Sequence, residues 1–472
     1  MTKNLLPNKT DDPSEWYIRV IQLAELADYG PSKGTMIMRP YSYAIWEYIQ
    51  KAFDNMIKEY GVENAYFPLF IPMSYLEREA SHVEGFAPEL AVVTHGGGQK
   101  LEEALVVRPT SETIINASFT KWVQSHRDLP IMLNQWCNAV RWEKRTLPFL
   151  RTSEFLWQEG HTVHATHEEA ISMQRYALDS YAKLYREYFA LDGYIGRKSK
   201  LETFAGADET LTYETMLPSG KALQSCTSHD LGQNFAKAFD TQFQDENGDN
   251  QYVWQTSWGL STRSIGGLIM GHGDNNGLVL PPRLAPTQVV IVPINLKETT
   301  REYVKTLEKQ MRTAGIRTKS DMRDDERFGY KLNKWEVKGV PLIVKVGDNE
   351  VAANKATIKR RDNSQETIVD LANVESEVRQ LLENVQSSLL ANSRRVRDEN
   401  TREASNYEEM KQILADHKGF VKVYWNDNPK IEAKIKEETK AVSRCCIEEN
   451  AQGTDFYTGE PASEIWLFAQ SY

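Results

Sequence analysis

Two short stretches decide the fold: RWE at residues 141–143 and, after a short connection, RTSEFLWQEGH at 151–161. We read them as the two strands of one antiparallel hairpin. Successive side chains on a strand point to opposite faces. The pattern therefore places Arg141 and Glu143 on one face, and the returning strand adds Arg151, Phe155, Trp157, Glu159 and His161. One sheet surface thus collects arginines, carboxylates and aromatic rings.

This mixture of side chains favours a binding surface over a purely structural one. Buried charges are costly unless they are paired, and a solvated face does not need tryptophan and phenylalanine. Phosphates call for bidentate arginine contacts, and aromatic rings can enclose adenine or an apolar substrate. A carboxylate can bind an ammonium group, or metal-bound water near phosphates. A set of mutually paired ions remains the structural alternative.

A second stretch, WGLSTRSIGG at 258–267, predicts a strand that feeds a helix through Gly259. Ser261 is a natural N-cap, which places Arg263 in the first helical turn, where backbone N–H groups favour an anion. An arginine there opposes the helix dipole, and a residue that breaks a local rule often marks function. The alternative is an exposed surface arginine.

Two further stretches carry weaker signals. In RPTSE at 108–112 a strand meets Pro109 and a helix begins, so Thr110 or Ser111 as N-cap with Glu112 behind it is ordinary capping chemistry. KALQSCTSH at 221–229 is small and polar and ends on His229. A lone histidine is more often structural than catalytic, since nothing beside it completes a nucleophile–base pair.

Length and composition set the class of protein. The chain has 472 residues and a net charge of −10, which suggests about three domains of a soluble protein. No run approaches the ~20 apolar residues of a membrane helix, and the first residues contain no signal peptide, so we expect a cytoplasmic protein without a membrane partner. The four cysteines, at 137, 226, 445 and 446, form no disulfide framework.

The order of helix-like and strand-like segments and the local composition predict three domains and a linker. Residues 1–282 mix helices and strands without strict alternation, which predicts an α+β domain on an antiparallel sheet. Its expected elements are a helix at 41–60 and strands at 65–71, 105–108, 135–142, 155–163 and 251–259. Residues 283–392 predict a small α/β domain that ends in a helix at 374–392. Residues 393–405 suit a linker or an exposed helix, and 406–472 form a small C-terminal α/β domain.

The second domain contains a basic stretch. Between Lys297 and Arg361 there are 17 Lys and Arg against 10 Asp and Glu, a net charge of +7. In an acidic chain this favours polyanion contact confined to one region, although a solvated surface of mixed charge explains it equally well.

These stretches together resemble the class II aminoacyl-tRNA synthetases. The Arg141/Glu143 and Arg151/Glu154/Phe155 pair resembles their motif 2, the helix and strand ending at Pro72 their dimer-forming motif 1, and SWGLSTRSIGG at 257–267 their motif 3. More narrowly, RPTSE, FLRTSEFLWQEGHT, SHDLGQNFAKAF and GLVLPPRLAPTQVVIVP resemble the prolyl-tRNA synthetase family, in the branch shared by archaea, eukaryotes and some bacteria. The resemblance covers nearly the whole chain.

The resemblance implies a function and a set of roles. A homodimer would attach proline to tRNA(Pro) through a prolyl-adenylate, using ATP and Mg²⁺. Arg141 and Arg263 would be catalytic. Proline would contact Thr110, Glu112, Arg141, Trp157, Glu159, Phe204, His229 and Ser261. ATP would contact Arg141, Glu143, Arg151, Thr152, Gln224, Thr227 and Arg263. Glu336, Lys338 and Arg360 would read the anticodon, and the Tyr472 carboxylate would reach toward the active site.

The sequence departs from the family in three places, one of which is the connection KRTLPFL at 144–150, one residue short of the family's common length. Glu159 and Arg263 are 104 positions apart, which leaves no room for the editing domain that bacterial-type relatives insert. The C-terminal zinc site of this branch uses four cysteines, but here only Cys445 and Cys446 remain, while Asp455 and Phe456 stand near the usual second pair. Two adjacent cysteines cannot close a tetrahedral site, so we predict no structural zinc.

Three other functions stay open on the sequence. Another class II synthetase, for threonine, serine or glycine, is disfavoured because Trp157, Phe204 and His229 suit a flat apolar ring. A catalytically inactive paralogue would be expected to have lost one of the three arginines, at 141, 151 and 263. An ATP-dependent acid ligase without tRNA would leave residues 283–392 without a purpose.

Overall fold

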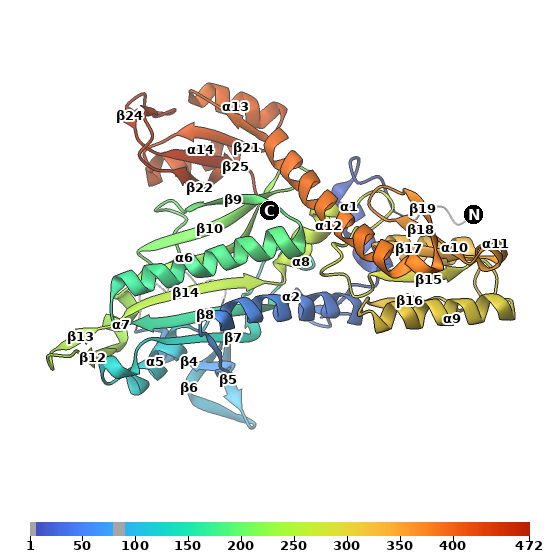
Figure 1. The fold of residues 1–472 in the computed structure, drawn as a ribbon. Coiled ribbons are helices and arrows are strands. Elements are labelled where there is room, and N and C mark those ends of the chain that lie inside the picture. Colours follow the sequence, from blue (N-terminus) through green and yellow to red (C-terminus); the bar gives the residue numbers. More distant parts are fainter. Residues whose placement is uncertain (1–5, 79–89) are drawn as a thin grey trace.

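The computed structural model describes residues 6–78 and 90–472. Within them the main sheet has eleven strands and runs through most of the molecule (Figure 1). Its order is β20 (Thr401–Glu403), β21 (Phe420–Tyr424), β25 (Ile465–Ala469), β22 (Val442–Glu448), β9 (Gly193–Arg197), β10 (Glu209–Met216), β11 (Ala222–Gly232), β14 (Trp254–Ser261), β8 (Glu154–His164), β7 (Ile131–Val140) and β3 (Glu63–Asn64). Apart from β20–β21 and β3–β7, neighbouring strands are antiparallel, which confirms the α+β prediction.

Helices α2 (Pro40–Glu59) and α6 (His167–Leu184) cover one face of this sheet (Figure 1). On β8, on β14 and on β11 near Ser228, the residues that face these helices have even numbers: Tyr181 of α6 donates to Gln158 of β8, and Ser228 of β11 donates to the Gln174 carbonyl. Trp258 of β14 is buried there. Because side chains alternate along each strand, the odd-numbered neighbours of these residues face the other side, where the functional site lies.

The predicted hairpin exists, but its two strands end sooner at the turn than expected and extend further at their other ends. Strands β7 and β8 pair from Ile131 with Val163 to Val140 with Glu154. Arg141, Glu143 and Arg151 therefore lie in the connection between the strands, where the Arg141 N–H donates to the Ser153 carbonyl and Leu147 bridges Arg151. Their place in the site comes from the path of this connection and not from strand alternation.

The predicted strand at 65–71 is mostly wrong. Only β3 and β4 (Phe70–Pro72) flank this stretch. Between them, the Phe67 N–H donates to the Gln135 side chain and the Phe67 carbonyl accepts from Arg108. Backbone bonds at the two ends, from the Ala65 N–H to the Asn134 carbonyl and from the Arg108 N–H to the Leu69 carbonyl, do not continue into a ladder, because side chains bond the backbone in the middle, at Phe67.

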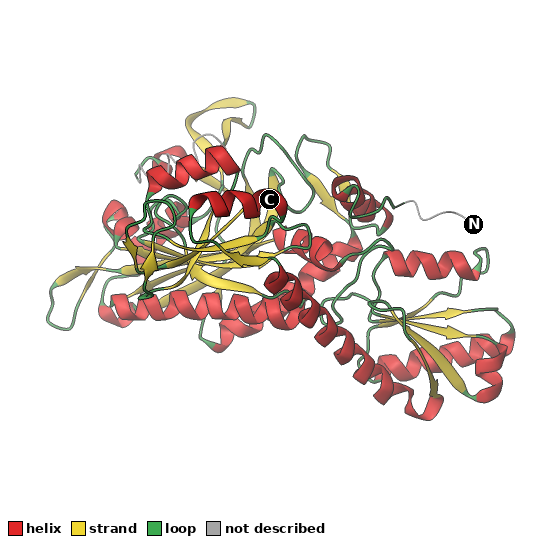
Figure 2. Ribbon diagram, turned by 90° about the horizontal axis from the view of Figure 1, so that it is seen from above, coloured by secondary structure: helices red, strands yellow, loops and turns green. Residues whose placement is uncertain are grey.

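The second domain has its own five-stranded sheet, set apart from the main sheet (Figure 2). Its order is β16 (Thr318–Ser320), β15 (Val289–Pro293), β17 (Leu342–Val346), β18 (Lys355–Arg360) and β19 (Glu366–Asp370). Its helices are α9 (Glu298–Thr313), α10 (Phe328–Val337), α11 (Asp348–Ala353) and α12 (Val374–Glu399). This confirms the predicted α/β domain. Helix α12 runs seven residues past its predicted end, into the segment 393–405, whose later part holds β20.

The C-terminal region does not form a separate sheet. Helices α13 (Tyr407–Asp416) and α14 (Pro429–Thr439) accompany strands that extend the main sheet, with Cys446 of β22 opposite Arg197 of β9. The remaining α-helices and strands among the described residues are α1 (Pro13–Leu23), β1 (Ala27–Tyr29), β2 (Met36–Met38), α3 (Met73–Leu76), β5 (Ala91–Gly96), β6 (Gln99–Val107), α5 (Glu112–Trp122), α7 (Asn234–Phe239), β12 (Gln242–Gln244), β13 (Asn250–Tyr252), α8 (Arg263–His272), β23 (Gly453–Thr454) and β24 (Pro461–Ala462). No helix in the described part of the chain is long and apolar enough to span a membrane.

Candidate active site

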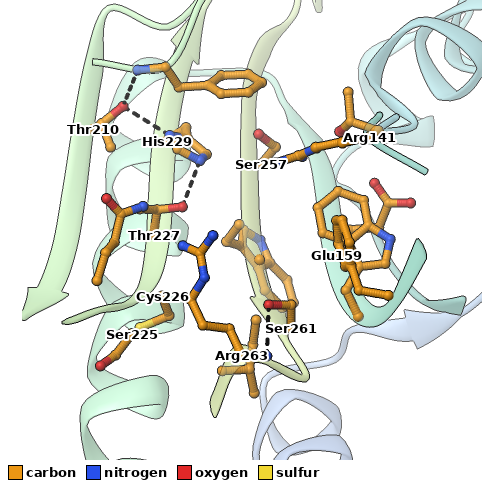
Figure 3. A pocket seen from close by; sticks show the side chains of 18 of the residues that line it. Arg141, Glu159, Thr210, Ser225, Cys226, Thr227, His229, Ser257, Ser261 and Arg263 are labelled. Atoms are coloured by element: carbon orange, nitrogen blue, oxygen red, sulfur yellow. Dashed lines mark hydrogen bonds between the residues drawn. The ribbon is translucent and has the colours of Figure 1, made fainter. Parts of the chain in front are cut away.

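One cavity of about 400 Å³ opens on the face of the main sheet that the helices leave free (Figure 3). It is lined by every residue that the sequence predicted to bind proline or ATP: Thr110, Glu112, Arg141, Glu143, Arg151, Thr152, Trp157, Glu159, Phe204, Gln224, Thr227, His229, Ser261 and Arg263. These residues come from β8, β11, β14, the start of α8, the N-terminus of α5, the β7–β8 connection and, for Phe204, the β9–β10 connection. The fold thus brings the separate stretches into one site, while the role of each residue stays a prediction.

Three arginines concentrate positive charge in this cavity. The Arg141 Nε donates to the Pro109 carbonyl (3.1 Å), and its guanidinium lies over the Phe155 and Trp157 rings. Arg151 is 3.6 Å from the Glu143 carboxylate. The pKa of Arg263 is lowered by burial and then by the charges of Arg141 and Arg151. Cations held together at such a cost make a strong site for a polyanion.

Arg263 is held at the start of α8 as expected. The N-cap of α8 is Thr262 and not Ser261, although the Ser261 hydroxyl accepts the Arg263 N–H at 3.3 Å. The Arg263 Nε donates to the Leu150 carbonyl at 3.2 Å, which ties this helix to the β7–β8 connection. The arginine of motif 3 and those of motif 2 are therefore fixed relative to each other.

Glu159 is buried and saturated with protein donors. Its carboxylate accepts from His161 (2.9 Å), from the Ser111 N–H (3.2 Å) and hydroxyl (2.5 Å), and from Gln135 (2.9 Å). Burial alone would raise the pKa of Glu159, but His161, Ser111 and Gln135 outweigh it and the pKa is lowered. Burial would lower the pKa of His161, yet Glu159 and Glu112 raise it. Glu159 and His161, both on β8, form a buried ion pair, and the two Ser111 contacts join this pair to the start of α5.

The start of α5 differs from the helix capping that the sequence predicts at residues 110–112. Ser111 is the N-cap of α5, but no side chain caps the helix. The Ser111 hydroxyl donates to the Glu159 carboxylate instead of accepting from the helix backbone, and the Thr110 hydroxyl donates to the Glu112 carboxylate. Glu112 is buried and lines the cavity. The pattern typical of a cap is used to place a carboxylate in the site.

His229 sits between two threonines (Figure 3). Its Nδ1 is 2.9 Å from the Thr210 hydroxyl, its Nε2 is 3.0 Å from the Thr227 hydroxyl, and the Phe204 ring lies 4.5 Å away, centre to centre. Burial lowers the pKa of His229 to about 4. The imidazole is therefore neutral at neutral pH, and the cavity gains a polar, uncharged wall beside Phe204.

Some lining residues were not predicted from the sequence, among them Glu202, Thr210 and Ser257. Ser257 shares the odd-numbered face of β14 with Ser261, so strand alternation could have found it. Thr210 joins the site only because β10 pairs it with His229. Nothing in the sequence around Glu202 marks it as a site residue.

The three predicted anticodon residues all have partners within the protein. Lys338 is 9% exposed, pairs with Glu25 of the first domain and lies over the Tyr41 ring. Glu336 accepts from Lys359 at 2.5 Å, and Arg360 pairs with Asp362 at 2.7 Å. Lys338 is thus engaged in the contact between the first and second domains.

The Tyr472 side chain lies at the start of β11, outside the residues that line the cavity. Its hydroxyl is 3.2 Å from that of Ser219, and the Lys221 ammonium lies over its ring. The Tyr472 N–H donates to the Ala222 carbonyl. The end of the chain therefore contacts the strand that carries Gln224.

A cavity built on an antiparallel sheet, with arginines from a motif 2 hairpin and a motif 3 helix, defines the core of a class II aminoacyl-tRNA synthetase. In agreement, residues 93–272 match the family model of the tRNA synthetase class II core domain (G, H, P, S and T). Residues 288–381 match an anticodon binding domain, and 407–472 match the C-terminal domain of prolyl-tRNA synthetases.

Similar proteins narrow the class. A chloroplastic/mitochondrial proline–tRNA ligase of Arabidopsis thaliana is 50% identical over 98% of this chain and 88% of its own length. The proline–tRNA ligase of Chloroherpeton thalassium is 47% identical over 99% of both. A crystal structure of prolyl-tRNA synthetase from Cryptosporidium parvum, complexed with halofuginone and AMPPNP, is 41% identical over 99% of both chains with a TM-score of 0.95. The chain belongs to the prolyl-tRNA synthetase family.

Proposed function

We propose that this chain is a proline–tRNA ligase that attaches L-proline to tRNA(Pro) in two steps. In the first, a proline carboxylate oxygen attacks the α-phosphorus of ATP, prolyl-adenylate forms and pyrophosphate leaves. In the second, a ribose hydroxyl of the terminal tRNA adenosine attacks the adenylate and AMP leaves. The observation that carries this proposal is the single cavity that gathers all the predicted proline and ATP residues.

The arginines supply the chemistry of the first step. Arg141 holds the proline carboxylate beside the α-phosphate, and Arg263 and Arg151 hold the phosphates. Two anions must meet for this reaction, so catalysis rests on positioning and on neutralising charge. Glu143 and Gln224 offer oxygen donors at the same cavity, which suits Mg²⁺, since it binds through one or two carboxylates and substrate phosphates. Bound Mg²⁺ would neutralise phosphate charge.

The other end of the cavity suits proline. Trp157 and Phe204 provide apolar walls for the pyrrolidine ring, and the buried Glu112 provides the negative charge that its ammonium group needs. The neutral His229 adds no charge that would repel this ammonium. Glu159 acts differently from the substrate contact that the resemblance implies, because its oxygens are taken by protein donors; it positions Ser111 and the start of α5.

The tRNA side of the proposal is assigned by domain. Residues 1–282 form the catalytic domain, 283–392 the anticodon-binding domain, 393–405 the link and 406–472 the C-terminal domain. Glu336 and Arg360 remain anticodon candidates, with Lys338 at the domain contact. We assign the chain to the archaeal/eukaryotic-type branch without editing. In support, the residues between β8 and β14 are accounted for by α6, the main-sheet strands β9–β11 and short elements around them.

Assembly, metal content and compartment complete the proposal. The chain forms a homodimer through α2 and the β1–β2 hairpin, where Tyr29, Ile37 and Tyr43 are exposed. It holds no structural zinc: Cys445 and Cys446 point into different apolar clusters. Cys446 could share a cation with Glu449 and Glu464, but Arg197 already pairs with both carboxylates. It works in the cytoplasm, consistent with four free cysteines.

Amino-acid-dependent ATP–pyrophosphate exchange across the twenty amino acids tests the function. We expect exchange with proline, and we expect Arg141→Ala to abolish it while the far-UV spectrum stays unchanged. Exchange with threonine and not proline would refute the substrate, exchange with none would favour an inactive paralogue, and an active Arg141→Ala would refute its role. Light scattering tests the dimer, and elemental analysis tests for zinc.

A further inference from the structure

A buried ionic cluster joins the C-terminal region to the catalytic sheet. Arg444 of β22 donates to one Glu214 oxygen through Nε (3.0 Å) and Nη2 (2.7 Å), and the Lys198 Nζ is 3.1 Å from the other oxygen. All three residues are at most 4% exposed. Burial would raise the pKa of Glu214, but Arg444 and Lys198 lower it, so the carboxylate is charged.

The need to hold the C-terminal region against the catalytic sheet does not explain this ionic cluster. An apolar cluster of Met216, Ala222, Phe420, Cys445, Leu467 and Ala469 already joins the same strands. Burying charges costs free energy that their attraction often fails to return, and apolar replacements are frequently as stable. Such a cluster is best explained by what it positions.

Glu214 stands opposite an irregularity of β11, the strand that carries part of the ATP site. The pairing of β10 with β11 runs from Thr212 with Thr227 and Tyr213 with Cys226 to Glu214 with Gln224, so it skips Ser225. One extra residue on a strand is a β-bulge, a feature that re-aims side chains next to active sites.

The bulge has a direct consequence for the site. Gln224 and Thr227 are three positions apart, so on a regular strand they would face opposite sides of the sheet. The extra residue, Ser225, puts both on the face of the cavity, where both are lining residues. The bulge is therefore what allows Gln224 and Thr227 to serve one ligand.

The cluster reaches the bulge from both sides. Glu214 is the cross-strand partner of Gln224. The Thr212 hydroxyl lies 3.0 Å from the Glu214 carboxylate and 3.1 Å from the Cys226 carbonyl, the residue that follows Ser225. Fixing the Glu214 carboxylate therefore fixes the backbone on either side of the extra residue.

We propose that Arg444 is a positioning residue for ATP: by holding Glu214 it keeps the bulge at Ser225 in place, and with it Gln224 and Thr227. The inference rests on the proposed function for the identity of the ligand. It concerns ATP more than proline, because His229 is anchored beyond the bulge by Thr210, in regular pairing. The C-terminal region thereby acts on the first reaction step without touching the substrates.

Arg444→Met tests this, because it leaves Lys198 and Glu214 as a neutral pair. Arg197→Met is the matched control: Arg197 also links the catalytic sheet to the C-terminal region, but it pairs with Glu449 and Glu464 rather than with Glu214. For each full-length variant we would measure the KM for ATP and for proline in exchange, the Kd of a non-hydrolysable ATP analogue by calorimetry, and the unfolding midpoint.

We expect Arg444→Met to raise the KM for ATP and the Kd of the analogue about tenfold while the KM for proline stays within about twofold. Arg444→Lys should restore part of the lost ATP affinity. Arg197→Met should leave the KM for ATP, the KM for proline and the Kd of the analogue unchanged. Equal effects on ATP and proline, an effect of Arg197→Met as large, or an unchanged analogue Kd in Arg444→Met would overturn the inference. If Arg444→Met does not fold, Arg444→Lys carries the same comparison. Absent proline exchange in the wild type would refute the function alone, since analogue binding needs no amino acid.

Discussion

Replacing Glu159 by glutamine is the sharpest test of how the site is held together. The change keeps the size and shape of the side chain but removes its charge. In the wild type the carboxylate accepts from His161, Ser111 and Gln135, and it is 1% exposed. The amide group of glutamine would face these donors with N–H groups of its own.

The structure sets the size of the effect. Removing one partner of a buried ion pair costs about 3–5 kcal/mol, because the remaining charge loses its compensation. His161 is buried and its pKa is raised by Glu159, so it is the charge left behind. We therefore expect Glu159→Gln to lower the free energy of unfolding by about 3–5 kcal/mol at pH 6.

The pH dependence of this loss in the free energy of unfolding follows from the pKa shifts of Glu159 and His161. The pKa of Glu159 lies below its usual 4.5, so its contribution is present above pH 4.5 and is lost as the pH falls through the folded pKa. The pKa of His161 lies above its usual 6.5, so its contribution is present below pH 6.5 and is lost as the pH rises through the folded pKa. The difference between wild type and variant should be largest between pH 4.5 and 6.5.

Urea unfolding followed by circular dichroism measures this difference. Glu154→Gln is the matched control, because Glu154 begins the same strand but is exposed and accepts from Asn138; surface changes of this kind cost less than about 0.5 kcal/mol. A loss below about 1 kcal/mol in Glu159→Gln, or one no larger than in the control, would show that Glu159 and His161 are not a charged pair.

Three further predictions concern the same cavity. Arg263→Gln should lower the rate of proline-dependent exchange by about 10²–10³-fold, with no loss in unfolding midpoint, because a cation in the first turn opposes the helix dipole; a rate near wild type would remove Arg263 from the mechanism. Gly160→Ala should destabilise the protein by about 1–3 kcal/mol in a thermal melt, since the added methyl would overlap the buried ring of Trp258; an unchanged melt would contradict this packing. The pKa of His229 is lowered to about 4 by burial, so its contribution to stability is complete above pH 6.5 and falls toward pH 4. The KM for proline should accordingly be flat from pH 6.5 to 8 and rise below about pH 5, and a steep change near pH 6.5 would contradict a buried, neutral imidazole.

The elements of the site were largely predictable from the sequence. Alternation along β8 correctly put Trp157, Glu159 and His161 on one face, because a strand has a fixed period of two. The conflict between Arg263 and the dipole of its own helix is visible in the sequence alone and marks that residue. Both signals arise within a few contiguous residues, where covalent geometry sets the outcome.

Other features depended on contacts between distant segments. Arg141 and Arg151 enter the cavity from a connection whose path is set by its packing, although the sequence pattern predicts strands there. Residues 65–69 form no strand because the side chains of Arg108 and Gln135 bond the Phe67 backbone groups that a neighbouring strand would have paired. The predicted C-terminal domain extends the catalytic sheet, since β22 pairs with β9.

Taken by itself, the sequence determined the class of fold, the family and the residues that meet in the cavity, because these follow from local periodicity and from motifs in a fixed order. Only the tertiary structure decided how they are held. Glu159, an expected substrate contact, is also a buried ion-pair partner of His161, and a bulge at Ser225 brought Gln224 onto the same face as Thr227. Both depend on which strand lies opposite and in which register, and register is a property of two segments together.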